Sequence, residues 1–336
     1  MRFPRCTIQL ILILQCIPLF VCCEKQEDIT EEVVSEEIRG VADRYKEMER
    51  EGRISLSFLF FTDPHLLNTE AYNRTILQDR LASSFPTAKE VYDYLHLGFC
   101  LSGGDWLIAG DSQSLAKEKL LLADTHLKET FPCYYKMMGN HDTNYQGYVS
   151  GEDNSRGDLD REWVNKVYFS ETGSAYYSFQ SQKTTFYILD SDLDWNVEMD
   201  DYKRSQIKWL ASSLTEEENE HVVIGIHMFY CSDQIVPMSE EIVKICEAYN
   251  SRNNLYVEDK EYDFSKAKGK IHFILSGHEH KDAINYVGSN IPVINTVNYF
   301  RDGQYNFDIC ILDYTTGNLS MMRVGNGTDR TVKIVM

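Results

Sequence analysis

Apolar segments typical of buried strands alternate with helical segments along most of this chain, and this alternation constrains the fold more than any other sequence feature. The strand segments lie at residues 54–63, 98–105, 132–139, 175–192, 221–228 and 270–280. The helical segments between them end near residue 85 or lie at residues 86–96, 112–131, 202–214 and 239–249. This order predicts βαβ units arranged around a largely parallel sheet.

The remaining segments complete the predicted domain plan. Apolar residues from Val34 to Met48 recur at three- and four-residue spacing, which predicts one helix that ends near Gly52. Residues 144–170 are polar and irregular, as expected of an insertion or a lid loop, and residues 306–324 predict a hairpin. Because no repeat or Pro-rich linker interrupts the pattern, we expect one domain at residues 53–336, preceded by an acidic tether and the helix at residues 24–52.

The first 23 residues have the layout of an export signal. Two arginines precede an apolar run from about Ile8 to Val21, which is short for a membrane-spanning helix. The run ends at Cys22 and Cys23 and turns acidic at Glu24, which resembles a bacterial lipoprotein signal with Cys23 as the lipidated residue. We therefore expect an exported protein that is either attached to a membrane of the cell envelope through an N-terminal lipid or simply secreted.

Charge and cysteine spacing exclude some classes of function. The formal net charge of −19 argues against nucleic acid as a stable partner, because phosphate backbones attract Lys and Arg. It does not exclude a small phosphate ester held by metal ions. The five cysteines beyond the signal show no CxxC or other metal-type spacing, so we interpret most of them as small buried hydrophobic residues.

Side chains of metal-ligand type follow five of the predicted strands, at the strand ends where ligands of open α/β sheets bind. Each has an ordinary alternative: Asp and Asn cap turns, and a lone buried His is usually structural. Their recurrence at successive strand ends favours a shared site. The residues are Asp63, His65, Asp105, Asn140, His141, Asp142, His227, His278 and His280. Four other histidines have no partner motif and are interpreted as structural, namely His96, His126, His221 and His272.

These residues occur in short motifs whose order resembles the signature of the calcineurin-like metallophosphoesterases. The motifs are Asp63-Pro-His65, Gly104-Asp105, Gly139-Asn140-His141-Asp142, His227 and Gly277-His278-Glu279-His280, and they span about two thirds of the chain. The resemblance implies an α/β fold of two packed mixed β-sheets flanked by helices, a four-layer sandwich.

The same resemblance implies a dinuclear metal centre that hydrolyses a phosphate ester with a bridging hydroxide. Asp63, His65 and His280 would bind one ion, and Asp105 would bridge both ions. The second ion would be bound by Asn140, His227 and His278. Mixed imidazole, carboxylate and amide ligands suit divalent transition metals, with Mn, Fe or Zn the leading candidates. His141 would stabilise charge or protonate the leaving oxygen, and Asp142 would orient the His141 ring.

Several alternatives stay open at this stage. The substrate, expected to be a small phosphorylated molecule, could be a monoester, a diester or a pyrophosphate. The protein could also be a non-catalytic scaffold of the same fold, or a binding protein for a phosphorylated ligand. Purple acid phosphatases, a branch of the family, carry a metal-binding Tyr three residues after the bridging Asp. Here that residue is Ile108, which argues against the purple subtype.

Overall fold

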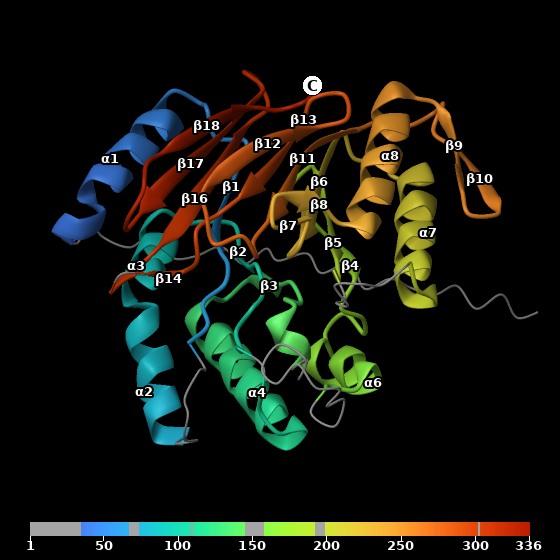
Figure 1. The fold of residues 1–336 in the computed structure, drawn as a ribbon. Helices are drawn as coiled ribbons and strands as arrows, with labels where there is room; N and C mark the ends of the chain where they lie inside the picture. Colours follow the sequence, from blue (N-terminus) through green and yellow to red (C-terminus); the bar gives the residue numbers. More distant parts are fainter. Residues whose placement is uncertain (1–34, 67–73, 109, 145–157, 192–198, 302) are drawn as a thin grey trace, which may run out of the picture.

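Two six-stranded sheets form the centre of the protein (Figure 1). The computed structural model describes residues 35–66, 74–108, 110–144, 158–191, 199–301 and 303–336. In order, the first sheet contains β18 (Arg330–Lys333), β17 (Asn318–Val324), β16 (Phe307–Asp313), β1 (Leu56–Phe61), β2 (Cys100–Ser102) and β3 (Tyr134–Lys136). The second sheet contains β12 (Ala283–Val287), β13 (Ile291–Asn295), β11 (Lys270–Ser276), β6 (His221–Ile226), β5 (Thr184–Leu189) and β4 (Tyr177–Ser181).

Both sheets are mixed in direction, so the prediction of a largely parallel sheet is only partly correct. The three strands β1, β2 and β3 pair in parallel, as do β5, β6, β11 and β13. Antiparallel strands flank these parallel cores: β16, β17 and β18 in the first sheet, and β4 and β12 in the second. The βαβ pattern predicted the parallel cores. Hairpin connections add the antiparallel strands β4, β12, β17 and β18, whereas β16 pairs with β1 over a long stretch of sequence.

Helices cover the outer faces of the sandwich (Figure 1). They are α1 (Glu36–Arg50), α2 (Arg74–Ser84), α3 (Pro86–Tyr94), α4 (Gln113–Thr130), α7 (Asp201–Thr215) and α8 (Pro237–Ser251). Local sequence explains where several begin. Ser112 and Asp200 accept hydrogen bonds from the first turns of α4 and α7, and α3 and α8 start at a proline, whose missing NH costs nothing there. The predicted N-terminal helix is confirmed as α1, which contacts β17 and α3.

The two-residue period of the strands divides apolar residues between two cores. In β5, Phe186 and Ile188 join the core that lies between the sheets, whereas Tyr187 and Leu189 join the core under α7 and α8. Phe58 of β1 contacts Phe186 edge-on across the sheets, with ring centroids 5.6 Å apart. Full burial of such a side chain contributes about 1.5–3 kcal/mol, so the inner core fixes how the two sheets lie relative to each other.

Some segments differ from the prediction or lie outside the described residues. The irregular segment at residues 144–170 contains a helical turn, α6 (Arg161–Trp163), that continues into a π-helical turn, η3 (Val164–Tyr168). Short hairpins that the sequence did not reveal are β7 (Tyr230–Cys231) with β8 (Gln234–Ile235), β9 (Asn254–Val257) with β10 (Lys260–Asp263), and β14 (Phe300–Arg301) with β15 (Gln304–Tyr305). The predicted export signal and acidic tether lie outside the described residues. Within the described part, no helix has the length and apolarity needed to cross a bilayer.

Candidate metal centre

All nine predicted site residues lie within the described part of the chain, just beyond strands of both sheets. Asp63 and His65 follow β1, Asp105 follows β2, and His227 follows β6. Asn140, His141 and Asp142 follow β3, and His278 and His280 follow β11. Because these strands run in parallel within each sheet, their carboxyl ends lie at the same edge, which brings the residues to one place.

The backbone at this edge is strained at several of these residues. Asp63, His65, Asp105, His278 and His280 all have positive φ, between 44° and 69°. Side chains other than Gly pay free energy for this conformation, and such residues persist where the surrounding structure holds them in place. All five strained residues are predicted ligands. This indicates that the turns adopt an unfavourable backbone conformation in order to direct these side chains toward one another.

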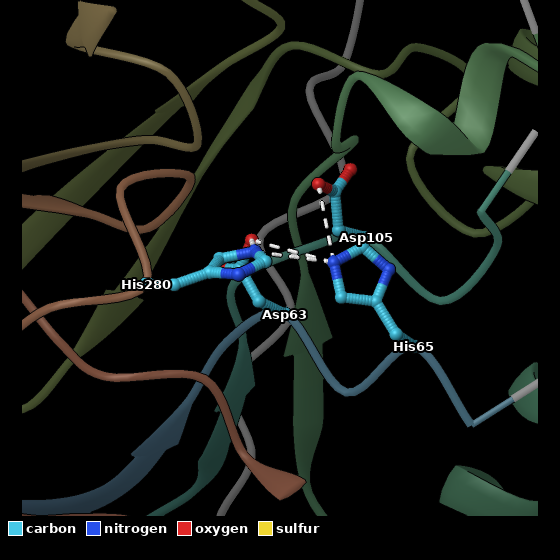
Figure 2. A group of neighbouring side chains, drawn as sticks. All are labelled: Asp63, His65, Asp105 and His280. Atoms are coloured by element: carbon cyan, nitrogen blue, oxygen red, sulfur yellow. Dashed lines mark hydrogen bonds and ion pairs between the residues drawn. The ribbon is translucent and has the colours of Figure 1, made fainter. Parts of the chain in front are cut away.

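Asp63, His65, Asp105 and His280 form the first group of converging side chains (Figure 2). Each offers one ligand atom, and these atoms all lie within 4.8 Å of one another. His280 Nε2 lies 3.0 Å from Asp63 Oδ1 and 3.2 Å from His65 Nε2, and His65 Nε2 lies 3.9 Å from Asp105 Oδ2. Two imidazoles and two carboxylates therefore point at one small volume.

Asp105, His227 and His278 form a second group, which shares Asp105 with the first. His227 Nε2 lies 3.1 Å from Asp105 Oδ2. Asn140 completes the arrangement, because its Oδ1 lies 3.1 Å from His227 Nε2 and 2.7 Å from His278 Nδ1. The structure thus brings together all seven residues predicted as metal ligands, in two groups joined by the residue that was predicted to bridge.

The donor set fits divalent transition metals. Asp105 Oδ2 is buried, and although His227 Nε2 lies 3.1 Å away, no well-aligned donor among the described residues satisfies this oxygen. A buried carboxylate oxygen without a donor is costly unless a cation is nearby. Oxygen and imidazole ligands together suit Mn, Fe or Zn.

The electrostatics of the two groups favour positive charge at their centre. Burial opposes the charge on His227, but Asp105 and Asp63 raise its pKa to about 10. Burial also opposes the charge on Asp63, but His227 and the hydrogen bond from His280 lower its pKa. In contrast, burial lowers the pKa of His278 to about 4, so this ring is neutral, the form in which imidazole binds metals.

Backbone carbonyls orient two of the histidines. His65 Nδ1 lies 2.8 Å from the Leu107 carbonyl, and His227 Nδ1 lies 2.7 Å from the Gly103 carbonyl. Donation from Nδ1 to these oxygens leaves Nε2 as the ligand atom of each ring. Neither Gly103 nor Leu107 could be found from sequence, because a carbonyl partner leaves no side-chain signal.

His141 and Asp142 have different partners from those expected. The Asp142 carboxylate accepts hydrogen bonds from the backbone NH groups of Asp105, Trp106, Leu107 and Gly139, at 2.7–3.1 Å. His141 Nδ1 instead lies 3.0 Å from the Ile108 carbonyl. The predicted role of Asp142 in orienting the His141 ring is therefore corrected: the carboxylate shapes the turn that carries Asp105. Burial and nearby Asp105 raise the pKa of Asp142 to about 7, and its backbone hydrogen bonds oppose that rise.

Two glycines let the metal-binding loops approach one another. A Cβ atom on Gly139 would overlap the backbone and carboxylate of Asp105, and one on Gly277 would overlap the Thr62 side chain and Asp63 Oδ2. Thr62 itself donates to Asp63 Oδ2 over 2.7 Å, an interaction that the sequence did not suggest. These two motif glycines thus allow loops from different strands to pack closely, because a side chain at either position would overlap the neighbouring loop.

Comparison of the sequence with models of known protein families identifies the family of this chain. Residues 56–282 match the sequence model described as Calcineurin-like phosphoesterase. The chain belongs to this family. Its members are metal-dependent phosphoric ester hydrolases, so the predicted family, fold class and enzyme class are confirmed. A search of curated proteins gave no match.

Solved structures of similar fold include phosphatases from other organisms. A dimetal phosphatase from Danio rerio is 12% identical, with a TM-score of 0.56, and the alignment covers 84% of this chain and 100% of that chain. A purple acid phosphatase from yellow lupin is 13% identical, with a TM-score of 0.48, and the alignment covers 83% of this chain and 53% of that chain. At these identities, the likeness to the Danio rerio protein supports the fold, and the site rests on the geometry of this chain.

Proposed function

We propose that this protein hydrolyses a small phosphate ester at two metal ions held by the groups that share Asp105. The observation that carries the proposal is the position of Asp105, whose buried Oδ2 faces both His65 Nε2 and His227 Nε2. When bound, a pair of ions would polarise the phosphoryl group and lower the pKa of an attacking water, so no side-chain base is required. Mn, Fe or Zn are the proposed ions on the basis of the ligand types.

The residues of the chain have separate tasks in this proposal. Asp63, His65 and His280 hold one ion, whereas Asn140, His227 and His278 hold the other. His141 packs edge-on against His65, with ring centroids 5.2 Å apart, and its Nδ1 is turned to the Ile108 carbonyl. We assign its Nε2 to the substrate, where it donates a proton to the leaving oxygen or stabilises charge on the phosphoryl group.

The scaffold alternative is disfavoured because every predicted ligand position keeps a ligand-type side chain and these side chains converge. The substrate is narrowed to a small molecule, since the net charge of −19 opposes extended phosphate chains. Monoester, diester and pyrophosphate substrates differ in the charge carried by the reacting group. A panel of aryl monoesters, aryl diesters and nucleoside diphosphates, assayed with Mn, Fe or Zn, would rank them. Failure of every substrate to turn over in the metal-loaded protein would contradict the proposal and favour a binding protein.

We also propose that the protein is exported and either lipidated at Cys23 or secreted. The basic, apolar and acidic segments around Cys22 and Cys23 support this proposal. Mass spectrometry of the protein isolated from its native cells would decide between a lipid on Cys23 and simple cleavage. A chain that retains residues 1–23 would contradict both forms.

A further inference from the structure

Four charged residues connect to the loop that carries His278 and His280, and we call them the arginine clamp. They are Asp282, Asp308, Arg323 and Arg330. Two of them, Asp308 and Arg323, are buried, and the other two are partly exposed. Asp282 follows His280 by two residues, at most about 7 Å of chain. The other three lie on β16, β17 and β18 of the first sheet, outside the residues that match the family model.

Arg323 is the centre of the clamp. Its guanidinium donates from Nη1 and Nη2 to the two carboxylate oxygens of Asp282, at 2.9 Å and 2.7 Å. Its Nε donates to Asp308 Oδ1 over 2.9 Å, and Asp308 lies directly opposite Arg323 in the pairing of β16 and β17. The Arg323 side chain is 1% exposed and that of Asp308 is 0% exposed. A planar guanidinium paired with two carboxylates has little freedom to move.

Arg330 and the second sheet complete the contacts. Arg330 lies 3.2 Å from Asp282 Oδ1, donates to Asp308 Oδ2, and donates to the Asn295 carbonyl at the end of β13. Asp282 Oδ1 also accepts from the Val297 NH over 3.1 Å. The clamp therefore joins the first sheet to the two loops that follow β11 and β13 of the second sheet.

The chain packs closely against the clamp at Gly327, where there is no room for a side chain. Gly327 has a φ of +119°, and a Cβ atom there would lie 2.7 Å from Arg323 Nη1 and 3.1 Å from Asp282 Oδ2. Buried ion pairs often add little net stability, because desolvation offsets their attraction. Because the clamp contacts this loop from several directions, its geometry is suited to holding the loop in place.

From this geometry we infer that Arg323 is a positioning residue of the metal centre, which acts through Asp282 to hold His280 and His278 at their ligand positions. This inference rests on the proposed function, since it requires that these histidines bind metal. Outer-sphere groups of this kind typically change metal affinity by about 10–100-fold. The effect should therefore appear in metal binding itself and not only in turnover.

The test compares metal affinity in matched variants, measured by competition with a chromophoric chelator well below the unfolding temperature. Asp282→Asn keeps the side-chain shape but removes the charge, and Arg323→Lys keeps the charge but removes the paired donors. We expect each to weaken binding of at least one of the two ions by about 10–100-fold. The double variant should lose less affinity than the product of the two single effects, because both changes break the contact between Arg323 and Asp282.

Arg252→Ala is the matched control at the other end of β11. Arg252 donates to the carbonyl of Tyr249 in α8 and to that of Gly269, just before β11, at 2.7 Å each. Its loss should lower the unfolding temperature and leave metal affinity unchanged. Wild-type affinity in Asp282→Asn and Arg323→Lys would overturn the inference while leaving the proposed function intact. If Arg323→Lys does not fold, Asp282→Asn decides alone. A wild-type protein that binds no metal would instead defeat the proposed function, and the inference with it.

Discussion

Two sets of histidines lie at opposite ends of the same two strands. His227 and His278 follow the carboxyl ends of β6 and β11, whereas His221 and His272 lie near the amino ends of those strands. Six residues of extended chain separate the two ends, about 20 Å. At the amino end, His221 Nδ1 lies 2.8 Å from His272 Nε2, His272 Nδ1 contacts the Val335 carbonyl, and the Tyr314 ring stacks on His221 at 3.4 Å.

The surroundings determine what each set can do. Asp63 and Asp105 face the carboxyl-end histidines and raise the pKa of His227 to about 10. At the amino end, the neighbours are a carbonyl, a tyrosine ring and a second imidazole, and burial lowers the pKa of His272 to about 4. What sets the carboxyl end apart is that its carboxylates, Asp63 and Asp105, are buried, whereas the carboxylate that acts on His221 at the amino end belongs to the exposed Glu220.

The largest expected effect comes from removing the shared carboxylate. Asp105→Ala should weaken binding of both ions by more than about 100-fold, the upper range for groups that act only on a ligand. Hydrolysis should fall with metal content, measured by elemental analysis after dialysis. His272→Gln, at the other end of the strands, should retain both ions. Loss of only one ion from Asp105→Ala would show that the carboxylate is not shared.

Replacing His141 should separate catalysis from metal binding. His141→Ala should keep both ions and lose about 10²–10⁴-fold in turnover, the usual contribution of a positioned acid or base. Metal content and turnover should be measured on the same sample. Unchanged turnover would remove His141 from the mechanism and leave it a turn residue.

Replacing Asp142 tests whether its carboxylate shapes the turn of Asp105, as the structure indicates, or orients the His141 ring, as the sequence predicted. Asp142→Asn replaces an acceptor of four backbone NH groups by a side chain that has only one oxygen. Because the turn of Asp105 loosens, we expect metal affinity to fall by about 10–100-fold. Had Asp142 only oriented the His141 ring, turnover would fall at full metal content, so that result would restore the original prediction.

The amino-end pair predicts a pH dependence of stability. His272 has a folded pKa of about 4, below the value of about 6.5 expected when unfolded, so the unfolded state binds the proton first. The free energy of unfolding should therefore fall as pH drops through this window, and His272 should account for about 2 kcal/mol of the loss between pH 7 and pH 5. Urea unfolding of wild type and His272→Gln, both stripped of metal, measures the difference. An equal loss in both proteins would contradict the assignment.

The smallest effect is spectroscopic and concerns tyrosine. A tyrosine stacks on histidine at the amino end, whereas Ile108 stands where purple acid phosphatases have a metal-binding Tyr. Iron-loaded protein should therefore show no tyrosinate charge-transfer band under oxidising conditions. A purple sample would indicate a tyrosine that reaches the ions from elsewhere. Tyr145 and Tyr148, in the aromatic-rich region after Asp142, lie outside the described residues and would be the first to replace.

The carboxyl-end set was predictable because its signal is local. Each ligand follows an apolar segment directly, as Asp105 does after residues 100–102 and His227 after residues 221–226. Parallel pairing then brings such positions together within each sheet, and the packing of the two sheets joins the two halves of the site. Helix positions were predictable for the same reason, since α1 and α4 show periodic apolar residues within one segment.

The amino-end set and the role of Asp142 depend on long-range register, which the sequence does not encode locally. His272 sits at an irregularity between Ile271 and Phe273, where the pairing of β11 with β6 shifts by one residue. Such a bulge redirects a side chain, and it brings His272 to His221 across 51 residues of sequence. Likewise, Asp142 meets the turn of Asp105 only because β2 and β3 are neighbours.

The place of β16 has a consequence for how the protein is made. This strand pairs with β1 near the middle of the first sheet, although 246 residues separate Phe61 from Phe307. At synthesis rates of about 5–20 residues per second, the ribosome adds that stretch over roughly 12–50 s. All seven predicted metal ligands are synthesised before β16. They are therefore present while one edge of β1 is still unpaired. Synthesis of β16 therefore sets the earliest moment at which β1 can be paired along both of its edges.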